Sequence, residues 1–195
     1  MGTRLSRQIP SPEEYREISK EILSGSDRSV AIILAAEVER FLELAILTKF
    51  INTDDKDKLI SHDGPLATFS RKIQIGYAIG LYNSELRDDL DRIRDVRNDF
   101  AHSVMPICFN TPSIKDRCLT LQKIPATNGS LILLRWGLNQ GPADIIGLED
   151  SLDKTARNRF IVACNCASAW LYGVITNTVL APASSSELLP TSGAA

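Results

Sequence analysis

The sequence has little of what most catalytic or metal centres are built from. It contains only two histidines and four cysteines. The cysteines, at positions 108, 118, 164 and 166, show neither C-x-x-C spacing nor a nearby pair of histidines. Since zinc sites typically need closely spaced Cys and His ligands, we expect no metal and no other cofactor. A phosphate-binding loop, a dinucleotide-binding glycine pattern, a nucleophile elbow and an H-E-x-x-H helix are also absent from the sequence.

The chain also lacks an excess of one charge. Its 22 basic and 24 acidic residues give a formal net charge of -2, so no global positive field attracts nucleic acid or an anionic membrane. No signal peptide pattern is present, which together with reduced, structural thiols predicts a cytoplasmic protein. The apolar run at residues 160–180 is interrupted by Asn165 and Asn177, and we interpret it as a buried helix rather than a membrane span.

Hydrophobic spacing and capping signals predict an all-α fold. The residues S-P-E-E at 11–14 are typical of a helix start. Residues 27–51 contain neither proline nor glycine and carry apolar residues around more than half of the helix circumference, which predicts a central helix contacted on several sides. Further helices are expected at about 66–79 and about 151–180. With 44% hydrophobic residues, the chain is able to fill one core.

The most regular pattern lies in residues 84–104, where we expect one long helix. Its apolar stripe is formed by Leu86, Leu90, Ile93, Val96, Phe100 and Val104. Prolines and glycines make residues 105–150 an irregular insert, with a short helix near 113–122 and a strand or hairpin around 130–136. We therefore predict an N-terminal helix (1–24), a bundle domain (25–180) with about five main helices in the whole chain, and a disordered tail (181–195).

The hexapeptide R-N-D-F-A-H, near the end of this long helix, is the candidate functional site. Asn98 and His102 are four residues apart and share one face of the helix. Arg97 falls within the apolar stripe, about 140° around the helix from His102. The two side chains meet only if Arg97 curls round, the helix ends early, or a two-fold partner contributes. Glu37 and Glu39, in the central helix, are candidate ion-pair partners for Arg97.

These residue types allow two interpretations. In a metal-independent cleavage of RNA, His102 would move the proton of a ribose 2′-hydroxyl, and Arg97 would stabilise the negative charge that develops on the phosphate. In the structural alternative, Arg97 forms ion pairs with Asp91 and Asp95, which lie on the flank of His102, and His102 caps the helix C-terminus. The residues alone leave both interpretations open.

The hexapeptide resembles the R-x-x-x-x-H signature of the HEPN superfamily. Members of that superfamily are compact helical bundles that often dimerise and include many ribonuclease toxins and effectors. The resemblance implies that Arg97, Asn98 and His102 are the catalytic residues and that the protein is a homodimer.

A longer set of residues resembles bacterial proteins grouped with the mannitol operon repressor. The matching segments are G-P-L-A-T-F-S-R-K-I at 64–73, G-Y-A-I-G-L at 76–81 and the hexapeptide at 97–102, and the resemblance covers roughly residues 28–180. It implies a HEPN-like helical bundle with a regulatory task.

Two functions follow as hypotheses. The first is a cytoplasmic regulator that acts through an unknown protein partner. Sequence-specific DNA reading is not expected, because Arg87, Arg92 and Arg94 of the long helix alternate with aspartates that would repel a phosphate backbone. The second is a HEPN-type endoribonuclease that binds RNA. Whether the protein is an enzyme stays open at this point.

Overall fold

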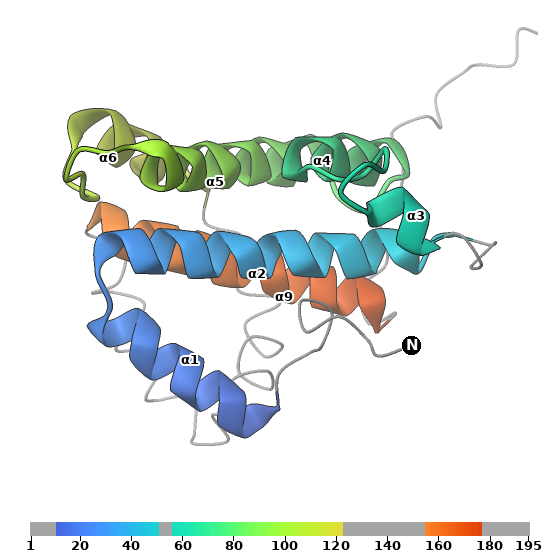
Figure 1. The fold of residues 1–195 in the computed structure, drawn as a ribbon, viewed down its shortest axis with the longest axis horizontal. Helices are drawn as coiled ribbons and strands as arrows, with labels where there is room; N and C mark the ends of the chain where they lie inside the picture. The colour runs from blue at the N-terminus through green and yellow to red at the C-terminus, as the bar shows by residue number, and fades with distance from the viewer. Residues whose placement is uncertain (1–10, 51–55, 123–154, 177–195) are drawn as a thin grey trace, which may run out of the picture.

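The computed structural model describes residues 11–50, 56–122 and 155–176, and the regular secondary structure of these residues is entirely helical (Figure 1). The helices are α1 (Pro12–Ser24), α2 (Asp27–Leu47), α3 (Lys56–Ile60), α4 (Phe69–Ala78), α5 (Ser84–His102), α6 (Pro112–Leu119) and α9 (Ala156–Ile175). Five of them, α1, α2, α4, α5 and α9, have ten or more residues. The predicted all-α bundle with about five main helices is confirmed, whereas the strand expected around 130–136 and the tail lie outside the described residues.

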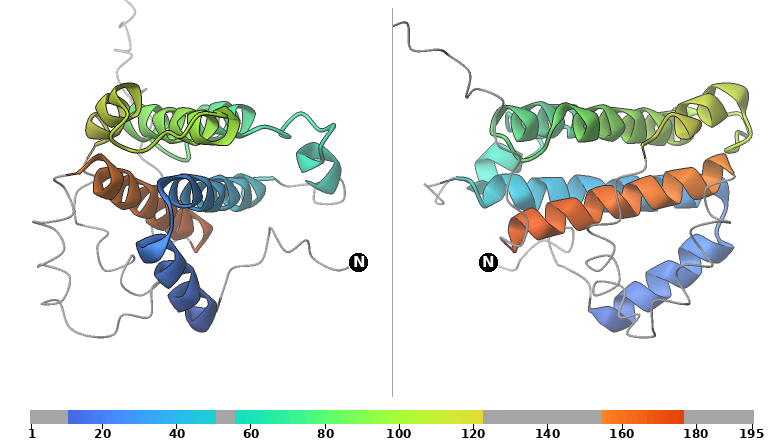
Figure 2. Two further views of the ribbon diagram at one scale, coloured as in Figure 1. Left: turned by 60° about the vertical axis from the view of Figure 1, so that its left-hand side comes forward. Right: turned by 180° about the vertical axis from the view of Figure 1, so that it is seen from behind.

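Helix α2 is the centre of the bundle and contacts α1, α4, α5 and α9. In Figures 1 and 2, α4, α5 and α6 lie on one side of the α2–α9 pair, while α1 diverges on the opposite side. The buried side chains of α2 include Leu34, Val38 and Phe41. The prediction of a helix contacted on several sides is therefore confirmed.

Helices α2 and α9 pack on each other more extensively than any other pair of described helices. Both helices bury several small side chains: Ala31, Ala35 and Ala45 on α2, and Ala163 and Ala167 on α9. The distance between packed helices depends on the size of the side chains at the contact, so small buried residues allow a close approach.

The predicted helix starts are largely confirmed by the caps. Ser11 accepts a hydrogen bond from the backbone of Glu14 and completes a capping box at the start of α1. Thr68 caps α4, and that helix ends just before Gly80, whose φ of 71° is left-handed. Helix α9 begins at Ala156, after the cap residue Thr155, five residues later than expected. The short helix expected near 113–122 is α6.

Three helices end earlier than their apolar patterns predict, among them α9, which ends at Ile175 and not at about residue 180. Helix α2 ends at Leu47, where Thr48 Oγ1 donates to the Ala45 carbonyl. Helix α5 ends at His102, because Ser103 has extended backbone angles. Val104 was expected in the apolar stripe of α5, but it follows the helix and is 98% exposed. The prediction of a helix to residue 104 is wrong at that end.

Among the described residues, no helix combines the length and the hydropathy that a membrane crossing requires.

Candidate functional site

Arg97 projects from α5 toward α2. Its Nη1 donates a 2.9 Å hydrogen bond to Asn98 Oδ1, and its Nη2 lies 3.7 Å from Glu39 Oε2. The Arg97 side chain is 33% exposed. Solvent therefore reaches it, even though its position on the helix falls within the apolar stripe. Of the two candidate partners of Arg97, Glu39 is confirmed, whereas Glu37 lies 3.8 Å from Arg40 of its own helix.

The aspartates on the flank of α5 do not bind Arg97. Asp91 and Asp95 both accept hydrogen bonds from Arg94, at 2.5 and 2.8 Å. The structural interpretation was therefore correct in expecting ion pairs along α5, but wrong about the arginine that forms them.

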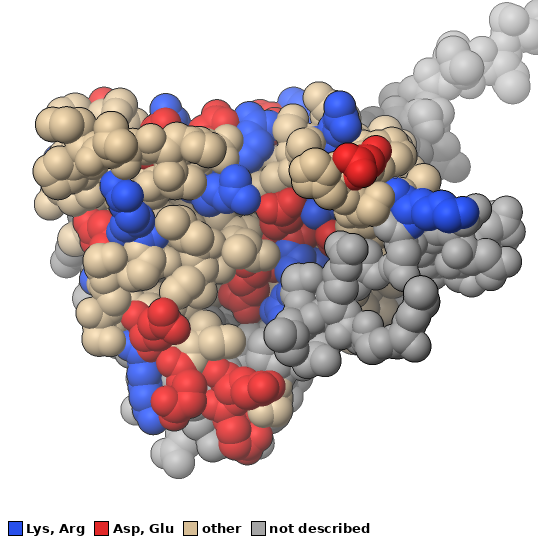
Figure 3. Space-filling model, in the orientation of Figure 1, with Lys and Arg blue, Asp and Glu red and all other residues tan. Residues whose placement is uncertain are grey.

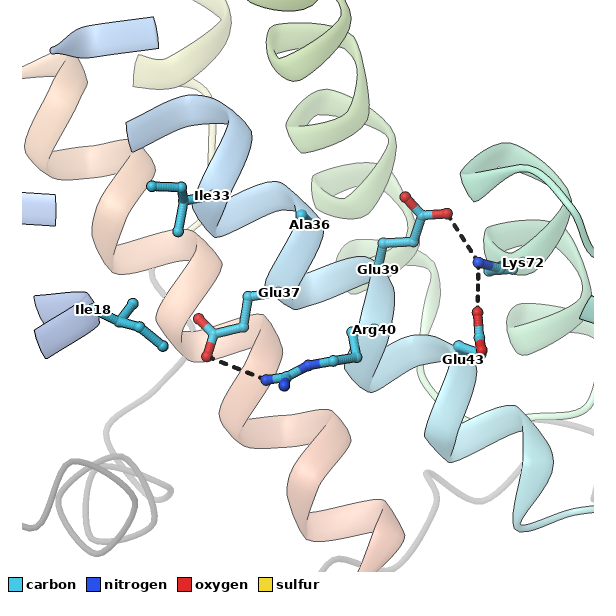
Figure 4. A pocket seen from close by; sticks show the side chains of 8 residues that line it. All are labelled: Ile18, Ile33, Ala36, Glu37, Glu39, Arg40, Glu43 and Lys72. Atoms are coloured by element: carbon cyan, nitrogen blue, oxygen red, sulfur yellow. Dashed lines mark hydrogen bonds and ion pairs between the residues drawn. The ribbon is translucent and has the colours of Figure 1, made fainter. Parts of the chain in front are cut away.

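A buried lysine extends the contact of Arg97 into a chain of charges. Lys72 of α4 is 6% exposed, and its Nζ lies 2.9 Å from Glu39 and 2.8 Å from Glu43. Figure 4 shows the Lys72 ammonium between these two carboxylates of α2. Glu39 is shared by Lys72 and Arg97, so two cations and two carboxylates connect α4, α2 and α5. A buried charge is tolerated only when it is paired in this way.

The role of Lys72 was not predicted from the sequence. One signal was available. Lys72 is three residues after Phe69 and four before the buried Gly76, so it shares their face. Glu39 and Glu43 are also four residues apart and therefore able to bind one cation from the same side of α2.

His102 lies in the last turn of α5 and is exposed. Among the described residues it has no hydrogen bond or ion pair. Arg97 is engaged by Glu39 and Asn98 and not by His102. Within one chain, the structure therefore joins Arg97 to Asn98 by a hydrogen bond, and His102 shares the face of Asn98 without being bonded to Arg97.

Two other residues of the hexapeptide, Asp99 and Phe100, contact the rest of the bundle. Asp99 accepts a 2.7 Å hydrogen bond from Arg117 of α6. Phe100 is fully buried, and its ring lies 5.0 Å from the ring of Phe109. The hexapeptide therefore contains two structural residues, Asp99 and Phe100, beside the candidate site residues.

A hollow of about 430 Å³ lies between α1, α2 and α4 (Figure 4). It is lined by Ile18, Ile33, Ala36, Glu37, Glu39, Arg40, Glu43 and Lys72. Acidic and basic side chains alternate near the middle of this face in Figure 3. Lys72 and its partners Glu39 and Glu43 line the hollow, whereas His102 and Asn98 do not. No group of three or more metal-ligating side chains occurs in the described parts of the chain.

The fold and its charged contacts define an all-α bundle organised around one central helix. Among solved structures, a chain of the X-ray structure of the MtlR-HPr complex from Escherichia coli has a similar fold, with a TM-score of 0.54 and 17% sequence identity. The similarity covers 80% of the present chain and 97% of that chain. It supports the predicted mannitol operon repressor-like fold. No family model and no curated protein matches the chain, and the assignment to the HEPN superfamily stays a prediction.

Proposed function

We propose that this protein is a cytoplasmic regulator resembling the mannitol operon repressor group, and that it acts by binding another protein. The observation that carries the proposal is the shared fold over 97% of a chain described in complex with HPr. A regulator of this kind needs a recognition surface on a stable bundle and no catalytic centre.

The charges of α5 support protein contacts rather than DNA reading. Arg87 lies 2.8 Å from Asp88, and Arg92 lies 2.9 Å from Asp89. A DNA-binding helix leaves its cations available to phosphates, whereas these arginines are each matched by a carboxylate of the same helix.

The test is a direct binding assay with HPr. Purified protein and HPr are mixed and analysed by size-exclusion chromatography with light scattering, and we expect a complex whose mass is the sum of the two components. An unrelated helical protein of similar size provides the control. The proposal fails if HPr does not bind and no specific partner copurifies with the protein from its own organism.

A second candidate function is a HEPN-type, metal-independent endoribonuclease that uses Arg97, Asn98 and His102. It is favoured by one observation: His102 is exposed, and Arg97 is one-third exposed, so RNA would have access to both. In this mechanism the His102 imidazole accepts the 2′-hydroxyl proton as that oxygen attacks phosphorus. Arg97 stabilises the charge on the phosphate, the 5′-oxygen leaves, and Asn98 positions Arg97.

Because no hydrogen bond joins Arg97 to His102 within the described part of one chain, this candidate invokes a homodimer in which each chain contributes one of them. Structured RNA is incubated with the protein in EDTA, and we expect cleavage that His102→Ala abolishes. The matched control is His62→Ala, since His62 is an exposed turn histidine. A mixture of Arg97→Ala and His102→Ala chains should recover part of the activity. Absence of cleavage, or equal cleavage by the His102→Ala protein, would refute the nuclease.

A further inference from the structure

The chain that follows α5 presents apolar side chains to solvent. Val104 is 98% exposed and Met105 is 67% exposed, and the adjacent Pro106 is also exposed. We refer to these three residues as the apolar tip. Val104 and Met105 are the most exposed of the large hydrophobic side chains in the described part of the chain. In Figure 3 the surface over the end of α5 and the following loop is mostly uncharged.

The backbone of the apolar tip is held in place. Arg28, at the start of α2, donates from Nη2 to the Ser103 carbonyl at 2.8 Å and to the Met105 carbonyl at 3.4 Å. The Met105 amide donates to Ser103 Oγ at 3.2 Å. Farther along, the Phe109 amide donates to Asp27 Oδ2 at 2.9 Å. Because the backbone of the tip is already fixed, binding of a partner there loses little backbone conformational entropy.

The exposed cation beside the apolar tip is Arg28, whose guanidinium donates to the carbonyls of Ser103 and Met105. The nearby carboxylates are already paired with arginines: Asp27 with Arg157 at 3.4 Å, and Asp99 with Arg117 at 2.7 Å. A complementary surface would therefore be apolar in its centre and acidic at its edge.

We propose that the apolar tip is the docking point for a protein partner, and that the partner receives it in an apolar pocket edged by carboxylates. This inference rests on the proposed function of the chain as a protein-binding regulator. A convex, fixed apolar projection fits a concave site, and large side chains buried at the centre of an interface provide most of its binding energy. A second copy of this chain is a poorer occupant, because a two-fold contact through the tip would bring the Arg28 guanidinium groups of both copies together.

The experiment begins with photocross-linking in the cells of the source organism. p-Benzoylphenylalanine replaces Met105, and in a matched control it replaces the exposed Gln74 of α4. We expect a discrete adduct with one protein from position 105 and not from position 74, with the cross-link in a segment that contains apolar and acidic residues. The partner identified by mass spectrometry is then purified and titrated with the protein. Val104→Ser combined with Met105→Ser should weaken binding at least about tenfold, whereas Ile79→Ser, a substitution of another exposed apolar residue, should leave it unchanged.

Each contrary outcome has a defined meaning. An adduct with a second copy of this chain, or the same adduct from position 74, refutes the proposed partner. A partner whose affinity is unchanged by the double substitution refutes the docking site and leaves the proposed function intact. Failure to recover any partner, by cross-linking or in the HPr assay, refutes the proposed function and this inference with it. Both serine substitutions are at exposed positions, and thermal melting of the variant verifies that it is folded.

Discussion

Replacement of Lys72 by methionine tests whether the chain of charges across α4, α2 and α5 stabilises the bundle. Methionine keeps an unbranched apolar stem but removes the ammonium from between two carboxylates. The Lys72 side chain is 7% exposed, and its partners Glu39 and Glu43 are 18% and 13% exposed. Removal of one member of a buried ion pair typically costs about 3–5 kcal/mol, because the other charge stays buried without compensation.

Two features of the structure reduce that figure. Glu39 keeps Arg97 at 3.7 Å, and both carboxylates are reached by some water. We therefore expect Lys72→Met to lower the free energy of unfolding by about 2–4 kcal/mol at neutral pH.

Urea denaturation followed by circular dichroism measures the change. Arg71→Met is the matched control, since Arg71 is the exposed neighbour on the same helix, and its effect should stay within about 0.5 kcal/mol. Adding Glu43→Gln to Lys72→Met should recover at least about 1 kcal/mol, because it removes the negative charge that has lost the Lys72 ammonium. If Lys72→Met costs less than about 1 kcal/mol, or Glu43→Gln recovers nothing, then the ion pairs do not hold α4 to α2 and the reasoning is wrong.

Three further predictions concern buried groups. Burial raises the pKa of Asp89, which accepts a hydrogen bond from the Gln122 amide. Since its protonated form is favoured in the folded protein, its contribution to stability is fully present below its ordinary pKa of 3.8 and is lost as the pH rises through the raised pKa. The stability of the native protein relative to Asp89→Asn should therefore fall over that pH range in denaturation experiments. Gly76→Ala places a methyl carbon 2.6 Å from the Tyr82 hydroxyl and should destabilise the protein by about 1–3 kcal/mol in urea. Burial raises the pKa of Cys118 to about 12, so a disulfide reagent at pH 8 should modify it only after unfolding, as mass spectrometry would show.

Each of these expectations has a contrary result. A stability difference for Asp89→Asn that is constant with pH would show that the carboxyl titrates alike in the folded and unfolded chains. A loss below about 0.5 kcal/mol for Gly76→Ala would mean that Tyr82 moves without cost. Modification of Cys118 at equal rates in native and unfolded protein would show that the helices open readily around it.

The helices could be predicted because their signals are local. Caps such as Ser11 and Thr68 and the left-handed Gly80 lie within a few residues of the ends that they determine. A long-range contact lies at the end of α5, where the helix ended earlier than predicted. The carbonyl of Ser103, the first residue after the helix, accepts a hydrogen bond from Arg28, 75 positions earlier in the chain, and no pattern within 84–104 contains that contact.

The candidate site was predictable only in part for the same reason. A charged Arg97 beside an apolar stripe requires a partner, and this reasoning led to the central helix and to Glu39. The position of Lys72 between Glu39 and Glu43 depends on how α4 packs across α2. Helix packing is set by many side chains together, so residue spacing alone shows which faces are polar but not which charges meet.

The small side chains buried on α2 and α9, the two helices that pack most extensively on each other, have an evolutionary consequence. A buried position such as Ala35 or Ala167 tolerates replacement by residues of similar volume, while a larger side chain would overpack the core. Selection then acts on residue size at these positions and much less on residue identity. Sequences can diverge widely under such a constraint while the arrangement of helices persists, as the shared fold at 17% identity illustrates. A search that compares side-chain volume along two helices of about this length and spacing would detect relatives that residue identity misses.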